Sequence, residues 1–156
     1  MMIDPKEFEL TCFSLKEATF NPSKIDFFVG TATGKLFYFY NGWFNNEKEL
    51  IHNDKDEGPI TNVLCYNDLV AWSTSTKIRL IHYSKRQKIC LIERPKRYPT
   101  FPEYLYQSTA TTPTFNWKKD RNTGQELFEV VWLNLIKICR LRLMEDQKYK
   151  MEVVRK

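Results

Sequence analysis

The segment from Glu57 to Pro95 constrains the fold more than any other part of this 156-residue chain. Its short apolar runs alternate with short polar clusters, and strands joined this tightly must be antiparallel because a parallel crossover needs about a dozen residues or more. Asn67 and Asp68 tolerate the positive φ angles of a two-residue hairpin. The segment therefore predicts a four-stranded antiparallel sheet with strands at Ile60–Tyr66, Leu69–Trp72, Ile78–Tyr83 and Ile89–Ile92.

The second of these runs indicates that both faces of the sheet are covered. Leu69, Val70, Ala71 and Trp72 are consecutive and apolar, so each face of a strand receives apolar side chains. An antiparallel sheet usually keeps one face in water. Four-stranded antiparallel sheets stacked on copies of themselves are the blades of a β-propeller. We therefore predict an all-β, WD-repeat-like propeller fold.

The pattern occurs three times along the chain. An apolar strand, a short turn and then a lysine followed by Leu or Ile recur around Lys35, Lys77 and Lys137. The first two lysines are 42 residues apart, within the roughly 40–45 residues of one propeller blade. The third follows after 60 residues, and we expect the insertion in a long surface loop at 96–112, which is rich in proline and polar residues.

Residues 1–156 are accordingly interpreted as one partial β-propeller of about three blades, at 14–53, 59–95 and 112–155. The first blade is expected to begin with a strand at Glu17–Phe20, and Phe8–Phe13 to be an outer strand of a preceding blade. The other strands of the first and third blades are predicted at Phe27–Gly30, Leu36–Tyr40, Glu49–His52, Thr114–Trp117, Leu127–Trp132, Ile136–Arg142 and Tyr149–Val154.

Three blades do not close a ring, because propellers have about four to eight. We therefore expect the chain to be a piece of a longer protein. Its end blades would expose apolar faces and unpaired edges, which predicts poor behaviour in isolation.

The sequence favours a cytoplasmic protein. No run of 18 apolar residues is present to span a membrane, and the N-terminus, MMIDPKEFEL, lacks the apolar core of a signal peptide. The cysteines are widely spaced inside predicted strands and form no CxxC pair, so we expect buried, reduced thiols rather than a metal or redox site. They are Cys12, Cys65, Cys90 and Cys139.

No catalytic, cofactor-binding or metal-binding residue is assigned, and we expect no enzyme activity. The stretch from Gly30 to Lys35 resembles a phosphate-binding loop, but three residues instead of four separate its glycines. Leu36 follows the lysine, and the next segment is a predicted strand rather than a helix. No motif surrounds the two histidines, and the acidic pairs are expected to be solvated surface: His52, His82, Asp56-Glu57 and Glu145-Asp146.

Charge divides the chain into halves of opposite sign. Residues 1–76 carry 6 Lys and Arg against 11 Asp and Glu, whereas residues 77–156 carry 18 against 8. Basic clusters with neighbouring aromatics can bind single-stranded nucleic acid, so a basic β-domain that binds RNA stays an alternative. Solvated hairpin tips explain the clusters more simply, and we expect no nucleic-acid partner. The clusters are Lys85-Arg86 with Lys88, Arg94 with Lys96-Arg97, and Lys118-Lys119 with Arg121.

Several short motifs occur in a fixed order: Gly34-Lys35-Leu36, Gly42-Trp43, Glu57-Gly58-Pro59-Ile60, Leu69 with Ala71-Trp72, Lys77-Ile78 with Tyr83, and Lys88-Ile89 with Ile92-Glu93-Arg94-Pro95. Together they resemble the N-terminal propeller of the vacuolar protein sorting-associated protein 41 family, subunits of the HOPS tethering complex. The likeness is good over about Phe28–Pro95 and weaker to Leu141. The family usually has glycine on both sides of the third-blade tryptophan, where Val131 and Leu133 stand here; Asn134 is the residue expected to supply a left-handed conformation.

The resemblance implies a non-catalytic scaffold in vesicle-mediated transport. Members of the family tether late endosomes, autophagosomes and adaptor-coated carriers to the vacuole or lysosome. The implied partners are other HOPS-type subunits, a small GTPase system and an adaptor coat, at the cytoplasmic side of late endosome and vacuole or lysosome membranes. Rigid blades present loops that carry function, but no binding residue is assigned. The alternative within this fold is the propeller of another endosomal tethering or coat subunit.

Overall fold

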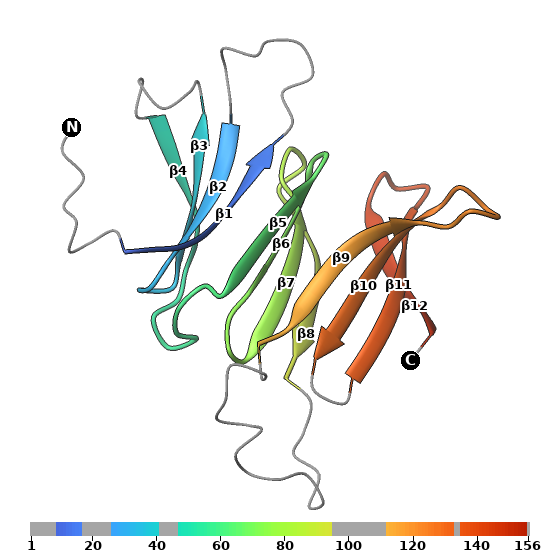
Figure 1. Cartoon of the computed structure of the whole chain (residues 1–156). Coiled ribbons are helices and arrows are strands. Elements are labelled where there is room, and N and C mark those ends of the chain that lie inside the picture. Colours follow the sequence, from blue (N-terminus) through green and yellow to red (C-terminus); the bar gives the residue numbers. More distant parts are fainter. Residues whose placement is uncertain (1–8, 17–25, 41–46, 95–111, 133–134, 156) are drawn as a thin grey trace, which may run out of the picture.

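The computed structural model describes residues 9–16, 26–40, 47–94, 112–132 and 135–155. These residues form three four-stranded antiparallel sheets, and within each sheet the strands lie side by side in chain order (Figure 1). The first sheet contains β1 (Leu10–Lys16), β2 (Asp26–Thr31), β3 (Lys35–Tyr40) and β4 (Glu47–Asn53). The second contains β5 (Asn62–Tyr66), β6 (Leu69–Ser73), β7 (Lys77–His82) and β8 (Gln87–Glu93). The third contains β9 (Thr114–Lys119), β10 (Glu126–Trp132), β11 (Leu135–Leu143) and β12 (Tyr149–Arg155).

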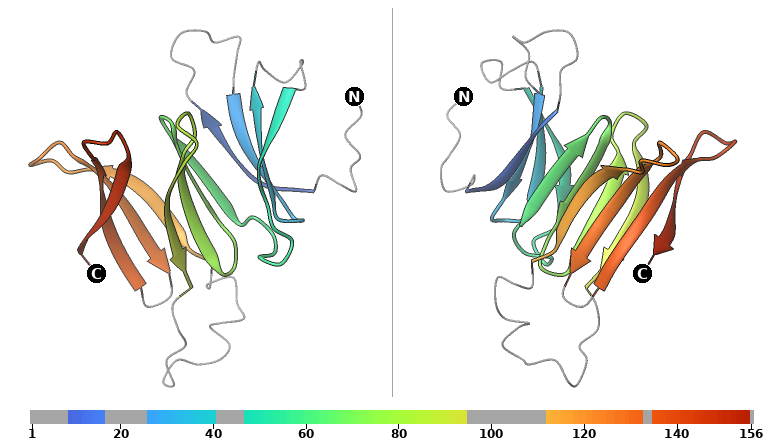
Figure 2. Two further views of the ribbon diagram at one scale, coloured as in Figure 1. Left: turned by 180° about the vertical axis from the view of Figure 1, so that it is seen from behind. Right: turned by 45° about the vertical axis from the view of Figure 1, so that its right-hand side comes forward.

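The three sheets stack face to face without closing a ring, as both views of Figure 2 show. Their first strands lie next to one another, with β1 beside β5 and β5 beside β9. Each sheet thus runs from an inner first strand to an outer fourth strand. This arrangement confirms the prediction of an all-β partial propeller.

The second sheet is covered on both faces, as its sequence indicates. All five residues of β6 are buried. Val70 and Trp72 point into the core shared with the first sheet, whereas Leu69 and Ala71 point into the core shared with the third. The predicted hairpin is also present, because Asn67 has a φ of 52° between β5 and β6. The strand predictions for the second and third sheets are confirmed to within a few residues.

The first strand of the first sheet lies elsewhere than predicted. We expected Phe8–Phe13 to belong to a preceding blade, but Leu10–Lys16 forms β1 and pairs with β2 of the same sheet. The alternation of polar and apolar residues along β1 does not indicate its buried face. Ser14 and Lys16 face the second sheet, while the apolar Phe13 and Leu15 face away from it. The predicted strand at Glu17–Phe20, Asn134 and nearly all of the loop 96–112 lie outside the described residues.

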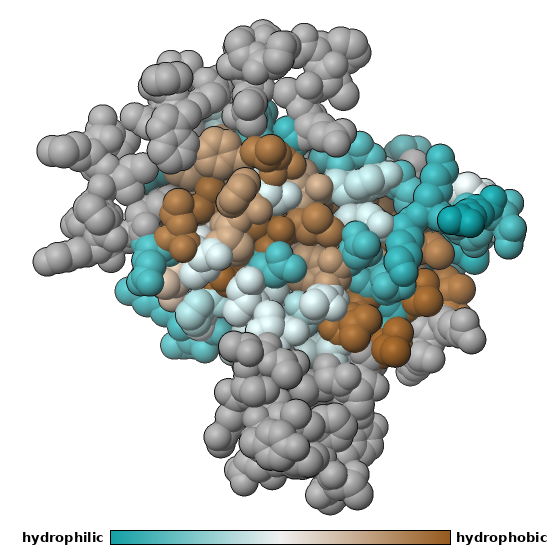
Figure 3. Space-filling view, viewed as in Figure 1, coloured by the Kyte–Doolittle hydropathy of each residue, from teal (hydrophilic) through white to brown (hydrophobic). Residues whose placement is uncertain are grey.

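The two end sheets expose apolar side chains on their outward faces. Phe13 is 69% exposed on β1, and Ile136 is 55% exposed on β11. Figure 3 shows apolar side chains gathered over the region of β1 and a smaller group near the lower end of the third sheet. These faces match the expectation that end blades lack a covering neighbour.

Candidate functional site between the first and second sheets

The linker that joins the first sheet to the second is held tightly against β1 and β2. The backbone N–H of Ile60 donates to Thr31 O (3.1 Å), and Thr11 Oγ1 donates to Ile60 O. Gly30 permits this approach, since a Cβ there would lie 2.5 Å from Cγ2 of Ile60. Ile60 itself is fully buried. The linker therefore places the residue three positions earlier, Glu57, between the two sheets.

Glu57 is the centre of a buried ion cluster that the sequence did not predict. We expected solvated surface at Asp56-Glu57, but Glu57 is only 5% exposed, whereas Asp56 is exposed. Its carboxylate accepts hydrogen bonds from Arg79 Nη2 and Lys77 Nζ (3.3 Å), both on β7. His52 Nε2 of β4 lies 3.4 Å from the other carboxylate oxygen. The cluster thus ties the linker to the second sheet and places it beside β4 of the first.

Burial and charge fix the protonation of this cluster. Burial alone would raise the pKa of Glu57, but the hydrogen bonds and charges of Arg79 and Lys77 outweigh it and lower that pKa. Burial lowers the pKa of His52, against the opposing pull of Glu57. At neutral pH a carboxylate therefore faces two cations and a neutral imidazole, which also packs against Trp72 at 5.4 Å between ring centroids.

A second ionic group, centred on Glu49 of β4, lies at the other end of the same interface. Glu49 accepts a hydrogen bond from Tyr83 Oη (2.8 Å) and pairs with Arg86, whose guanidinium lies 4.8 Å from the centre of the Tyr83 ring. The hydrogen bond from Arg86 lowers the pKa of Glu49. Burial, and then the hydrogen bond to Glu49, raise the pKa of Tyr83 to about 12, so the phenol stays a donor.

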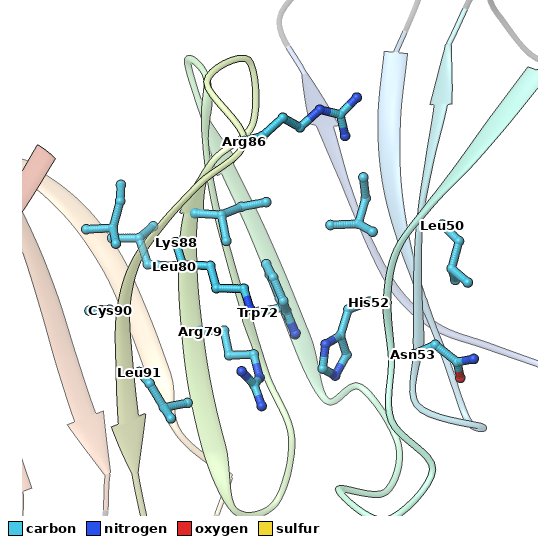
Figure 4. Close-up of a pocket in the computed structure, with 13 residues that line it drawn as sticks. Leu50, His52, Asn53, Trp72, Arg79, Leu80, Arg86, Lys88, Cys90 and Leu91 are labelled. Carbon is cyan, nitrogen blue, oxygen red and sulfur yellow. The ribbon is translucent and has the colours of Figure 1, made fainter. Parts of the chain in front are cut away.

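A groove of about 660 Å³ separates the outer parts of the first and second sheets. Figure 4 shows His52 and Trp72 facing each other there, with Arg86 toward one end and Arg79 toward the other. Its lining combines apolar and cationic side chains, and its residues come from β4 and from the second sheet. This combination of apolar and cationic side chains suits the binding of a ligand.

The remaining sequence candidates are placed apart from this interface or inside strands. The stretch that resembles a phosphate loop is the β2–β3 turn, with Gly34 at a φ of 80° and β3 directly after it. Within the described ranges no group of three or more His, Cys, Asp or Glu is placed to hold a metal. The charged hairpin pair Glu145-Asp146 is exposed, as expected.

All four cysteines lie in strands and are free thiols. The prediction of buried thiols holds for Cys139, whereas Cys12, Cys65 and Cys90 are partly exposed. Burial, and then the nearby Cys139, raise the pKa of Cys90 to about 12. Burial likewise raises the pKa of Cys12 and of Cys139, so these three thiols are protonated and weakly nucleophilic at neutral pH.

The described residues of the basic clusters lie in different turns of the fold. Lys85 and Arg86 lie in the β7–β8 hairpin, and Lys118 and Arg121 lie at the β9–β10 hairpin (Figure 1). Arg94 follows β8 at the opposite end of the second sheet. Two of these cations are engaged by carboxylates, since Arg86 pairs with Glu49 and Lys118 with Glu129 at 2.7 Å. Lys96-Arg97 lie outside the described residues.

Comparison with known proteins finds one family over nearly the whole chain. A family model of the Vps41 propeller, described as "Vps42 beta-propeller", matches residues 7–155. Two curated relatives carry the name vacuolar protein sorting-associated protein 41 homolog: one from Arabidopsis thaliana is 27% identical over 121 residues, and one from Solanum lycopersicum is 29% identical over 121 residues. Both alignments cover 78% of this chain and 11% of the relative, so the chain spans about a tenth of their length. The family match runs through all three sheets, and the chain belongs to the Vps41 β-propeller family.

Proposed function

We propose that this chain is part of a non-catalytic scaffold in vesicle-mediated transport. In this role it helps to tether late endosomes and related carriers to the vacuole or lysosome as part of a HOPS-like complex. Membership of the Vps41 propeller family over residues 7–155 carries the proposal. The names of both relatives, which assign them to vacuolar protein sorting, support it.

The architecture suits a scaffold. Stacked sheets joined by shared apolar cores and by the hydrogen bonds of Glu49 support the turns at either end, where binding residues are usually found. The proposed partners are other HOPS-type tethering subunits, a small GTPase system and an adaptor coat, with peripheral attachment to late endosome and vacuole or lysosome membranes. The described residues include no helix with the length and apolar character needed to cross a membrane.

Affinity purification from its own cells tests this proposal. The protein that contains this chain is tagged at its own locus, purified from a membrane-free lysate and analysed by mass spectrometry, with an unrelated cytosolic propeller carrying the same tag as the control. We expect the other HOPS-type subunits to be enriched over the control. Fluorescence of the tagged protein should also coincide with a vacuole or lysosome marker.

Two results would replace the proposal by an alternative. Enrichment of a different endosomal tethering or coat complex, without HOPS-type subunits, would make this the propeller of that complex. Binding of single-stranded RNA that weakens steeply as salt rises would favour a nucleic-acid role instead. We expect no RNA retention at low salt.

A further inference from the structure

The groove between the first and second sheets presents a continuous set of side chains from both walls. On the second sheet, Trp72 pairs with Arg79, Arg79 with Leu91 and Ile81 with Lys88 across neighbouring strands, so all five side chains share the face toward the first sheet. On the other wall, the register of β3 with β4 shifts at Leu36/Phe37. As a result the consecutive residues Ile51 and His52 both face the second sheet.

The charge of this lining is one-sided. Arg79, Arg86 and Lys88 lie along the groove, and none of the described residues that line it is a carboxylic acid. Arg79 and Arg86 already pair with Glu57 and Glu49. Lys88 is exposed, and across the described part of the chain no carboxylate lies within ion-pair distance of it. A ligand that enters the groove therefore meets an excess of positive charge and one free ammonium group.

Buried hydrogen-bond donors in the groove also lack acceptors. Trp72 is only 3% exposed, and among the residues that the structure describes its Nε1 has no hydrogen-bond partner; the same holds for Nε of Arg79. Buried N–H groups in proteins are nearly always paired. Their N–H dipoles add to the positive potential that an acidic ligand meets in the groove.

The groove is apolar between its charged ends. Ile51 and Ile81 pack against the core beside it, and Leu91 is 47% exposed at its side. A small anion would fill only a charged end and leave these apolar side chains in water. A flat lipid surface would not reach the deeply buried Trp72. A flexible chain with alternating apolar and acidic side chains would contact both kinds of surface.

We propose that this groove binds an extended peptide segment of a partner protein in which apolar residues alternate with acidic ones. The apolar residues lie against Ile81 and Leu91, and one acidic residue pairs with Lys88. This inference concerns the chain's own groove, and it holds whether or not the chain serves in tethering.

Fluorescence anisotropy with the full 156-residue chain tests the groove. The probe is a labelled peptide of alternating leucine and glutamate, compared with the same peptide carrying glutamine for glutamate and with polyglutamate. We expect the leucine–glutamate peptide to bind at least about tenfold more tightly than either comparison peptide. Lys88→Glu should weaken its binding about tenfold or more, because an attractive pair becomes a repulsive one.

Matched variants on the third sheet distinguish binding in the groove from non-specific electrostatic or hydrophobic binding. Lys119→Glu makes the same charge change at an exposed position of β9 and should alter binding less than about twofold. Leu91→Asn should weaken binding about tenfold, whereas Val131→Asn, at another partly exposed apolar position, should not.

Each of several outcomes would overturn the proposal. Polyglutamate binding as tightly as the alternating peptide would mean simple charge attraction, and equal effects of Lys88→Glu and Lys119→Glu would place the ligand elsewhere. Binding to vesicles rich in anionic lipid that is lost in Lys88→Glu, without peptide binding, would assign the face to a membrane. Circular dichroism of each variant, unchanged from the parent chain, shows that a loss of binding is not a loss of fold.

Discussion

The second sheet packs against its two neighbours in different ways. Toward the third sheet it contributes to the larger apolar core, in which Trp132, Phe128 and Val130 are fully buried. Toward the first sheet the core is smaller, and the ion groups of Glu57 and Glu49 border it. Both contacts use the same strand β6, whose successive residues alternate between them.

The contacts between the outer strands also differ between the two interfaces. β8 and β12 lie close together, and the Gln87 side chain joins them by donating to Tyr149 O (2.9 Å) and accepting from Tyr149 N (3.0 Å). At the corresponding place between the first and second sheets there is a groove. An apolar core with a polar bridge thus closes one interface, whereas ion pairs hold the other and leave room for a ligand. The apolar interface between the second and third sheets should contribute most to the free energy of unfolding. The ion pairs between the first and second sheets should make that interface sensitive to pH and salt.

Trp132→Ala is expected to have the largest effect. The side chain is fully buried in the core between the second and third sheets, and removal of a buried Trp leaves a cavity that costs about 3–5 kcal/mol. The free energy of unfolding, from urea denaturation followed by circular dichroism, measures this loss.

The neighbouring residue supplies the control for this prediction. Val131 is 39% exposed on the opposite face of β10, so Val131→Ala should change the free energy of unfolding by less than about 1 kcal/mol. Equal losses for the two variants would mean that the core between the second and third sheets does not dominate stability.

The sequence predicted the apolar packing of the second sheet better than it predicted the charged interface with the first sheet. The consecutive apolar residues Leu69–Trp72 require two covered faces, and that requirement leads directly to stacked sheets. By contrast, β1 turns Ser14 toward the second sheet and Phe13 away from it, which is the reverse of the pattern that marks a buried face. Hydrophobic periodicity therefore could not locate β1.

Glu57 was missed for a different reason. Its partners Lys77 and Arg79 lie 20 and 22 residues later in the chain, on β7, and only the fold brings them to the linker. A sequence of acidic residues in a loop predicts solvated surface. The groove is equally hidden, because the register shift that turns both Ile51 and His52 toward the second sheet has no local signature.

Glu57→Gln should have an intermediate effect, of about 2 kcal/mol. Breaking a buried ion pair usually costs about 3–5 kcal/mol, but the side chains of Lys77 and Arg79 are 32% and 25% exposed, so water replaces part of the lost interaction. The matched variant Glu129→Gln, in the exposed pair with Lys118, should cost less than about 1 kcal/mol. Urea denaturation at pH 7 measures both.

Denaturation at acidic pH tests whether the charge of Glu57 causes the loss of stability in Glu57→Gln. Its pKa is lower in the folded chain than the unfolded value of about 4.3, so its contribution is fully present above that value and is lost as pH falls through the folded pKa. The gap between the parent chain and Glu57→Gln should therefore shrink below about pH 4. A gap that stays constant down to pH 3 would assign the loss to packing rather than to charge.

Gln87→Ala should have the smallest effect and should act locally. It removes two hydrogen bonds to the backbone of Tyr149, which together contribute about 1–2 kcal/mol. Hydrogen exchange should become faster in β12, an edge strand, and stay unchanged in β4. Gln125→Ala, in the exposed β9–β10 turn, is the control and should leave both strands unchanged. Unaltered exchange in β12 would mean that the apolar core alone closes the outer edge of the interface between the second and third sheets.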